Sequence, residues 1–319
     1  MNRSDESIIR IGASSCLLGE KVRHDAGHKK DAYITDVLQE YFRFVSVCPE
    51  MGVGMGVPRE TVRLEGSVDS PRIVGTESGA EWTDRMRHYA EERTRKLETE
   101  NLCGYILKKD SPSCGMERVR VYQKGVPSRI GRGLYAETLI SRFPLLPVEE
   151  EGRLNDSKIR ENFIVRVFAY HRLRQVCRGR FSRKALIQFH TDHKFLLLSH
   201  SPKHYQQLGQ LVAHISEYND SEFCAKYGAL FMENLKIKST PSKNANVLQH
   251  ILGFLREHLE SDDRKYILDV IEDYRLGLVP LVVPITLIKH YVIKFNVSYI
   301  ADQIYLNPHP KELMLRNHI

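Results

Sequence analysis

Three β-prone segments in the first half of the chain each run into a cysteine that is followed by turn-forming residues. The cysteines are Cys16, Cys48 and Cys114. If the three segments are neighbouring parallel strands, their carboxyl ends lie along one edge of the sheet, where open α/β folds bind ligands. A single cysteine is more often a small buried apolar side chain. Three at equivalent positions favour a metal or cluster site.

The loop that carries Cys114 has the composition of a sharply turned backbone. Pro112 lacks a backbone donor and pushes the preceding residue towards an extended conformation, and Gly115 permits backbone angles that most residues resist. The loop therefore presents one thiol and the hydroxyls of Ser111 and Ser113 at the end of a strand. Because ordinary turns use the same residue types, the loop indicates a site only together with the other two cysteines.

The periodicity of hydrophobic residues along the sequence changes near residue 150. Residues 1–153 predict an α/β domain with a small, Rossmann-like, mostly parallel sheet, and residues 154–319 predict an all-α domain. In the first part we expect strands at 8–13, 44–47, 63–66, 72–75, 102–107 and 119–122, helices at 32–41, 79–97 and 134–142, a basic loop at 125–133, and an extended segment at 144–148. In the second part we expect helices at 159–177, 182–199, 202–215, 220–237, 244–259, 262–276, 287–297 and 298–306.

The composition is that of an ordinary globular chain, with 42% hydrophobic and 27% charged residues. We expect no secretory leader and no membrane span, because the most apolar run, 278–288, is interrupted by Pro280 and Pro284. Six cysteines are too few for a disulfide scaffold at this length, and a cytoplasmic setting would keep them reduced. We therefore predict a cytoplasmic protein with thiols available to a metal or cluster.

A net charge of +7 favours anionic partners. Basic residues crowd the segment 166–184, with aromatic side chains among them. This mixture can neutralise phosphates and stack bases, although a solvated helical face would have a similar composition. The residues of this segment that we expect to bind RNA are Arg174, Arg178 and Arg180.

Two further segments match no complete binding motif. Segment 51–59 has glycine at alternate positions but matches neither a Walker loop nor a dinucleotide fingerprint, so we assign no nucleotide phosphate site. Its cation, Arg59, either binds substrate or fixes Glu50. In the second half, His190, His193 and His200 invite a zinc interpretation, but the glutamate of the hydrolytic zinc motif is missing. Packing, a polar network or a nucleic-acid contact is the preferred role of these histidines.

The motifs around the three cysteines are specific enough to indicate a family. They are Ser15-Cys16-Leu17-Leu18-Gly19-Glu20, Val47-Cys48-Pro49-Glu50, and Ile106-Leu107-Lys108 through Ser111-Pro112-Ser113-Cys114-Gly115. They are similar to those of the bacterial thiouracil desulfidase (TudS) family, over residues 8–150. The second half resembles a helical domain often fused to that family, through Phe189-His190-Thr191-Asp192-His193-Lys194, His200-Ser201-Pro202-Lys203-His204-Tyr205, Pro284-Ile285-Thr286-Leu287 and Leu313-Met314-Leu315-Arg316-Asn317. The fused arrangement resembles the tRNA 4-thiouridine desulfidases called RudS.

The resemblance implies a [4Fe-4S] cluster held by Cys16, Cys48 and Cys114, with one iron left free for substrate sulfur. It implies catalytic roles for Glu50 and Ser111, and Ser113 is a second candidate hydroxyl. Cys103 lies inside a strand-like run before Gly104, so we expect it to pack rather than to bind iron. A zinc site is disfavoured, because three thiols need a fourth ligand in a closed structural site.

The expected reaction is the non-redox conversion of 4-thiouridine in tRNA to uridine. A basic helical domain suits a folded tRNA, with phosphate contacts that orient it and a base exposed to the iron. Free thiouracil is the alternative substrate. A non-catalytic iron–sulfur module for RNA binding or redox sensing is a further alternative, disfavoured because Glu50 and Ser111 accompany the thiols.

Overall fold

The computed structural model describes residues 8–178 and 181–318. The chain divides into two compact units, Met1–Asp156 and Ser157–Ile319. The first is an α/β unit and the second is built from helices. The predicted fold class, α/β followed by all-α, is confirmed.

A parallel sheet forms the centre of the first unit. Its strands are β1 (Ile9–Ser14), β2 (Phe42–Val47), β5 (Leu102–Leu107) and β8 (Val148–Glu150), in the order β2-β1-β5-β8. Each neighbouring pair is parallel. All side chains of β5 are buried, as expected for a strand covered on both faces. The carboxyl ends of β2, β1 and β5 therefore lie side by side.

A second, mixed sheet contains β3 (Val62–Ser67), β4 (Ser70–Gly75), β6 (Val119–Gln123) and β7 (Val126–Gly131), in the order β4-β3-β6-β7. The expected strands at 63–66, 72–75 and 119–122 are present, but the expected loop at 125–133 is wrong, because most of it is β7. The turn before β7 explains the difference. Lys124 and Gly125 both have positive φ, 49° and 84°, as in the two-residue type I′ turn that joins antiparallel strands.

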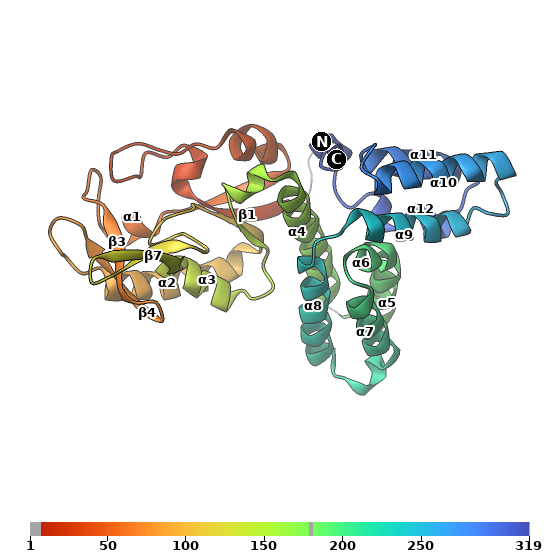
Figure 1. Cartoon of the computed structure of the whole chain (residues 1–319). Coiled ribbons are helices and arrows are strands. Elements are labelled where there is room, and N and C mark those ends of the chain that lie inside the picture. The colour runs from red at the N-terminus through yellow and green to blue at the C-terminus, as the bar shows by residue number, and fades with distance from the viewer. Residues whose placement is uncertain (1–7, 179–180, 319) are drawn as a thin grey trace. The chain divides into compact units, whose positions relative to one another are not determined.

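Helices cover the parallel sheet. They include α1 (Pro49–Gly52), α2 (Thr83–Leu97) and α3 (Leu134–Arg142), and α2 and α3 lie side by side (Figure 1). The α-helix predicted at 32–41 is instead a π-helical turn, Tyr33–Val37, followed by a 3-10 turn, Leu38–Glu40. Within the sheet, a Cβ added at Gly12 would lie 2.2 Å from the ring of Tyr105, so the aromatic ring occupies the space of the missing side chain.

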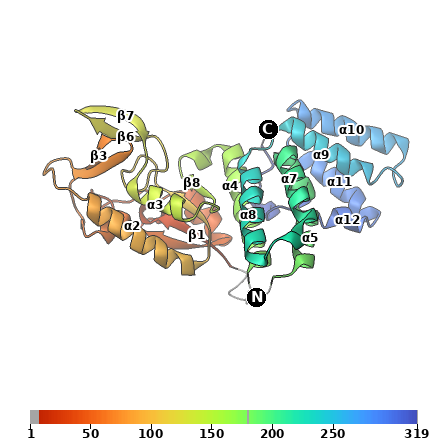
Figure 2. The same ribbon diagram turned by 90° about the horizontal axis from the view of Figure 1, so that it is seen from below.

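The second unit contains nine α-helices among its described residues. They are α4 (Ser157–Cys177), α5 (Arg183–Asp192), α6 (Lys194–His200), α7 (Pro202–Ala213), α8 (Asp220–Lys236), α9 (Pro241–Gly253), α10 (Ser261–Arg275), α11 (Val282–Lys294) and α12 (Ser298–Ala301). Helices α7 and α8 lie side by side (Figure 2). Among the described residues, no helix has the length and apolar content that a bilayer crossing requires.

Four helix predictions in this unit need correction. The helix predicted at 244–259 is α9, which ends at Gly253, because 254–258 form turns. The single helix predicted at 182–199 is divided at His193, which closes α5 and opens α6. Helix α11 begins at Val282 rather than at 287, because Pro284 lies in its first turn, where a proline removes no intrahelical hydrogen bond. The helix predicted at 298–306 is two short pieces, α12 and a 3-10 turn at Ile304–Leu306.

Candidate active site

A cavity of ≈ 370 Å³ opens at the carboxyl edge of the parallel sheet, and the three predicted cysteines line its wall. Cys16 lies in a 3-10 turn directly after β1, and Cys48 is the N-terminal cap of α1 directly after β2. Cys114 lies in the loop that follows β5. All three are free thiols. Glu50, Arg59, Ser111 and Ser113 line the same cavity, so the structure brings together all the site residues predicted in the first unit.

The thiols are held in a desolvated environment. Burial raises the pKa of Cys16 to about 11, and the ammonium of Lys108 acts in the opposite direction. Burial also raises the pKa of Cys48 and of Cys114. The three thiols interact electrostatically, because the charges of Cys48 and Cys16 both contribute to the raised pKa of Cys114. They are therefore protonated near neutral pH, and a bound cation would have to displace those protons.

The loop that presents Cys114 depends on two glycines. The amide of Gly133 donates to the carbonyl of Gly115 at 2.8 Å. A Cβ added at Gly133 would lie 2.4 Å from the carbonyl oxygen of Ser113, and one added at Gly115 would lie 2.8 Å from the carbonyl oxygen of Ser111. Both contacts are with backbone, so a side chain at either position would move the loop.

A chain of hydrogen bonds links the hydroxyls of this loop to Glu50. Ser113 Oγ donates to Glu50 Oε1 at 2.8 Å, and the two serine hydroxyls, of Ser111 and Ser113, lie 2.9 Å apart. Because a carboxylate only accepts hydrogen bonds, the single hydroxyl proton of Ser113 is used on Glu50. The proton of Ser111 then points to Ser113. The order of donation is therefore Ser111 to Ser113 to Glu50.

Ser111 is itself fixed by the backbone of the loop. Its Oγ accepts from the amides of Cys114 at 3.1 Å and Ser113 at 3.3 Å. The loop thus holds the hydroxyl of Ser111, which begins the chain of hydrogen bonds, and the thiol of Cys114 in one turn.

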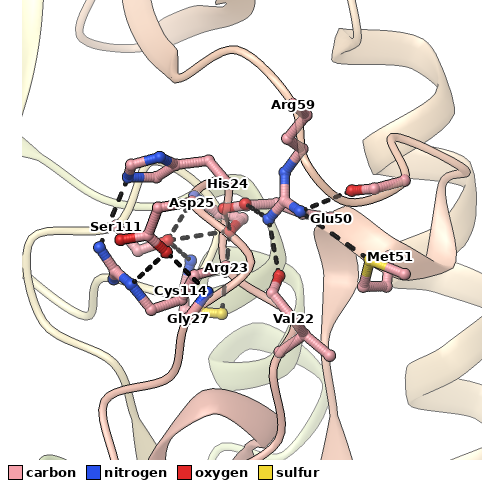
Figure 3. A network of polar contacts seen from close by, with 12 residues as sticks. Val22, Arg23, His24, Asp25, Gly27, Glu50, Met51, Arg59, Ser111 and Cys114 are labelled. Atoms are coloured by element: carbon pink, nitrogen blue, oxygen red, sulfur yellow. Dashed lines mark hydrogen bonds and ion pairs between the residues drawn. The ribbon is translucent and has the colours of Figure 1, made fainter.

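Arg59 fixes Glu50, the last residue of this chain of hydrogen bonds. Its side chain is only 6% exposed and forms an ion pair with Glu50. It also donates to the carbonyl of Val22 at 3.0 Å and to that of Gly56 at 2.8 Å. In Figure 3, dashed lines join Arg59 to Glu50, Met51 and Val22, and Ser111 and Cys114 belong to the same network of polar contacts. The Nε of Arg59 is buried and has no hydrogen-bond partner among the described residues.

Two residues of the site were missed by the sequence analysis. Ser14, the last residue of β1, hydrogen-bonds the thiol of Cys114 through its side chain, which lowers the pKa of that thiol against the effect of burial. Its Oγ also accepts from the amide of Lys108 at 3.0 Å. The ammonium of Lys108 lies 2.5 Å from Glu151, which fixes this cation on the cavity wall. The signal for Ser14 was its place directly before the Ser15-Cys16 motif.

The predicted RNA-binding residues lie in the other unit. Arg174 is in the last turn of α4, Arg178 is exposed just after that helix, and Arg180 lies outside the described residues. Part of the basic segment is structural, because Arg166 is only 9% exposed. Arg172 donates to the carbonyl of Pro308 at 2.9 Å. The cations of the segment that face solvent include Arg178, Arg183 and Lys184.

The remaining candidates are engaged elsewhere. Cys103 is 3% exposed inside β5 and lies 3.7 Å from the carbonyl oxygen of Asn101. His190 bonds the hydroxyl of Tyr227 at 3.0 Å, whereas His193 and His200 each bond a backbone carbonyl. Within the described part of the chain, no three His, Cys, Asp or Glu side chains are grouped as ligands of a single metal ion.

Comparison with known proteins identifies both halves. The sequence model of the family described as 2-thiouracil desulfurase matches residues 11–151. A second model, described as "Protein of unknown function (DUF1722)", matches residues 194–310. Escherichia coli (strain K12) YbgA is 30% identical over 165 residues, which cover 51% of this chain and 98% of YbgA. Bacillus subtilis (strain 168) YbbK is 31% identical over 110 residues, which cover 33% of this chain and 72% of YbbK.

The chain belongs to the 2-thiouracil desulfurase family through its first half and to the DUF1722 family through its second. The desulfurase half contains the cavity described above. Among solved structures, the chain is similar to the [4Fe-4S]-dependent thiouracil desulfidase TudS, with 30% sequence identity and a TM-score of 0.39 over 46% of this chain and 94% of that one.

Proposed function

We propose that the desulfurase half removes sulfur from a thiouracil base with a [4Fe-4S] cluster held by Cys16, Cys48 and Cys114. The observation that carries the proposal is the meeting of three free thiols, from the ends of three neighbouring strands, on the wall of one cavity. Family membership supports the thiouracil substrate. Because the thiols must stay reduced, we place the reaction in the cytoplasm.

The donor set fits such a cluster. Thiolates are the usual ligands of iron–sulfur clusters, with one cysteine on each ligated iron. A single zinc ion would need all of its ligands within about 2.3 Å of one centre, and the described thiols are not grouped in that way. The described wall of the cavity contributes no fourth cysteine. One iron would therefore be left without a protein ligand.

When bound, the cluster would supply an open iron position that acts as a Lewis acid toward the thiocarbonyl sulfur. The residues of the chain would stabilise the thiolates and hold the catalytic carboxylate. Lys108 places positive charge beside Cys16, which favours its thiolate, and the hydroxyl of Ser14 favours the thiolate of Cys114. Arg59 fixes the carboxylate of Glu50 on the cavity wall through their ion pair.

Protons move along the serine chain. Ser111 contacts the attacking water and passes a proton through Ser113 to Glu50, which acts as the general base. Arg59 holds Glu50 in the orientation that accepts it. In the overall reaction, a thiocarbonyl and water give a carbonyl and hydrogen sulfide. Atoms and electrons balance without an oxidant or reductant.

We propose 4-thiouridine in tRNA as the substrate. Two features support an RNA partner: the net charge of +7, and arginines that face solvent on or beside β6 and β7, namely Arg118, Arg120, Arg129 and Arg132. Free thiouracil is the second candidate, favoured by the family assignment, and a cavity of ≈ 370 Å³ is large enough for a small ligand.

The test is incubation of the anaerobically reconstituted protein with bulk thiolated tRNA, followed by nucleoside analysis. We expect 4-thiouridine to fall and uridine to rise in equal amounts. Parallel incubation with free 2- and 4-thiouracil ranks the two substrates. An iron-loaded protein that leaves all three compounds intact would refute the proposed function.

A further inference from the structure

A second cavity, of ≈ 110 Å³, lies in the helical unit. Its wall comes from the first turns of α4, the segment that leads into α9, the residues after α10, and the carboxyl-terminal segment. Two of the motifs that defined the resemblance of this half to a known domain contribute side chains to it, through His200 and Arg316. The cavity is small beside the 300–1,000 Å³ of typical small-molecule sites, so it suits a compact group.

A buried, fixed guanidinium lies on the wall. Arg316 is 9% exposed, its Nε lies 3.1 Å from Glu161 Oε1, and its Nη1 donates to the carbonyl of Tyr305 at 2.7 Å. Glu161 also contacts the ring of His318 at 3.6 Å. These contacts fix the guanidinium of Arg316 in place. Glu161 is its acidic partner.

Positive charge exceeds negative charge around this space. Among the described residues that line the cavity, the cations are Lys158, Lys238 and Arg316, and Glu161 is the acidic residue. Lys243 adds a further cation nearby, with its ammonium 2.6 Å from the carbonyl of His200. Burial, followed by the charges of Arg316, Lys243 and Arg166, lowers the pKa of His200 to about 4.

Neutral donors complete the wall. Ser239 Oγ is buried and has no hydrogen-bond partner among the described residues. Thr240 caps α9, a helix of 13 residues, and its Oγ1 accepts from the amide of Lys243 at 3.3 Å. The N-terminal end of a helix carries partial positive charge, so it adds to the effect of the side chains.

We propose that this cavity binds a phosphate group of RNA. The proposal rests on the RNA substrate proposed above and assigns part of its binding to a defined place in the helical unit. Lys238 contacts the phosphate at the mouth, where it is exposed, and Arg316 and the hydroxyl of Ser239 contact it from the wall. A phosphate offers several strong acceptor oxygens, which match a guanidinium, an ammonium and an unused hydroxyl.

Binding of inorganic phosphate to the full-length, reconstituted protein is measured first, by isothermal titration calorimetry and by ³¹P line broadening. Lys238→Glu should weaken it by about tenfold or more, because the change removes a charge-assisted hydrogen bond and places a negative charge beside the anion. Ser239→Ala should weaken it by a few-fold. Lys236→Glu is the matched control: Lys236 is exposed and two positions away, but it does not line the cavity. Its phosphate affinity should stay within about twofold of the parent value, since exposed charges at a distance are screened.

The same variants are then tested with bulk tRNA over a range of salt concentrations. Lys238→Glu should weaken tRNA binding and reduce the slope of log K against log salt by about one, and Lys236→Glu should leave the slope unchanged. Helical content and unfolding midpoints are compared for all variants, so that misfolding is recognised.

Three results would overturn the proposal. Absence of phosphate binding at millimolar concentration would remove the site. Equal loss in the Lys236 and Lys238 variants would show a diffuse charge effect. A local loss of phosphate binding with unchanged tRNA binding would assign the cavity to a free small anion. Phosphate binding requires neither iron nor turnover, so a protein that fails to desulfurate any substrate but gives the predicted binding results would refute the proposed reaction alone.

Discussion

Ser113 Oγ lies 2.8 Å from Glu50 Oε1, although the two residues are 63 positions apart. This bond joins the loop after β5 to the helix after β2. It also gives the hydroxyl of Ser111 a continuous path to a carboxylate. The proposed proton path therefore requires Ser113 as much as Glu50 and Ser111, the two residues that the sequence motifs indicate for catalysis.

We expect Ser113→Ala and Glu50→Gln each to reduce desulfuration by about 10²–10⁴-fold, the usual contribution of a positioned acid or base, without loss of iron. Because the residues act as one unit, the double variant should be little worse than either single one. Glu60→Gln is the control, since Glu60 also lines the cavity but its carboxylate is held by Ser78. Rates from nucleoside analysis that remain at the parent level in Ser113→Ala would refute the relay.

The three thiols are expected to be separately required for cluster binding. Serine at position 16, 48 or 114 should reduce iron content from about four per chain to a small fraction, with loss of the brown absorbance. Cys103→Ala should retain both, because Cys103 is buried within β5. Iron and acid-labile sulfide analysis after anaerobic reconstitution provides the measurement. Stoichiometric zinc in the parent protein would contradict the cluster.

Arg59 is expected to stabilise the first unit as well as orient Glu50. Arg59→Ala leaves Glu50, whose side chain is 18% exposed, without its cation, and removal of one partner from a buried pair costs about 3–5 kcal/mol. In the background of Glu50→Gln, the same change should cost clearly less. Urea unfolding, followed by the fluorescence of Trp82, gives the four free energies of unfolding of this cycle. Simple additivity would show that the ion pair does not contribute.

The helical unit should lose stability on acidification. Burial lowers the pKa of His190 to about 4, that of His193 to about 3 and that of His200 to about 4. In the unfolded chain these histidines have a pKa of about 6.5, so below that pH the unfolded chain binds protons that the folded chain does not bind. The free energy of unfolding therefore has its full value above pH 6.5 and falls between pH 6.5 and 4. All three pKa values are lowered, so the three contributions act in the same direction and the free energy of unfolding falls with each further drop in pH over this range.

Urea unfolding followed by circular dichroism at pH 7 and pH 4.5 checks this expectation. The variant His200→Gln should show a smaller difference between the two pH values than the parent. An unfolding free energy that is the same at both pH values would show that these histidines are accessible to protons in the folded state.

The exposed end of α4 should contribute to tRNA binding through charge. Arg178→Glu should weaken processing of tRNA and reduce its salt dependence, whereas the rate with free thiouracil measures the catalytic centre itself. Lys265→Glu, a charge reversal on exposed α10, is the control. Equal losses with both substrates would indicate damage to the fold rather than to an RNA contact.

The position of the site could be predicted because it depends on local sequence. Each cysteine follows a β-prone segment, and once these strands are parallel neighbours their ends must meet. The order β2-β1-β5-β8 itself depends on packing between segments far apart in the sequence, which periodicity does not record. Ser14 and Lys108 were missed for the same reason, since their roles arise only when β1 and β5 lie together.

Two local errors have clear physical causes. Lys124 has φ of 49°, a conformation that asparagine, aspartate or glycine usually adopts in such turns, so the sequence of this hairpin resembles that of a loop. At His193 the chain passes from α5 to α6 while its Nδ1 lies 2.7 Å from the carbonyl oxygen of Phe189. The apolar pattern continues across this junction, so the interruption leaves no trace in the periodicity.

Gly133 has no side chain, and the backbone of the Cys114 loop packs directly against it. A Cβ at this position would lie 2.4 Å from the carbonyl oxygen of Ser113. A methyl group at this position would push the thiol of Cys114 away from those of Cys16 and Cys48 without altering any of the three cysteines. Searches for working members of this family should therefore examine position 133 along with the cysteines, since a homologue with intact thiols and a bulkier residue there is expected to have lost its iron.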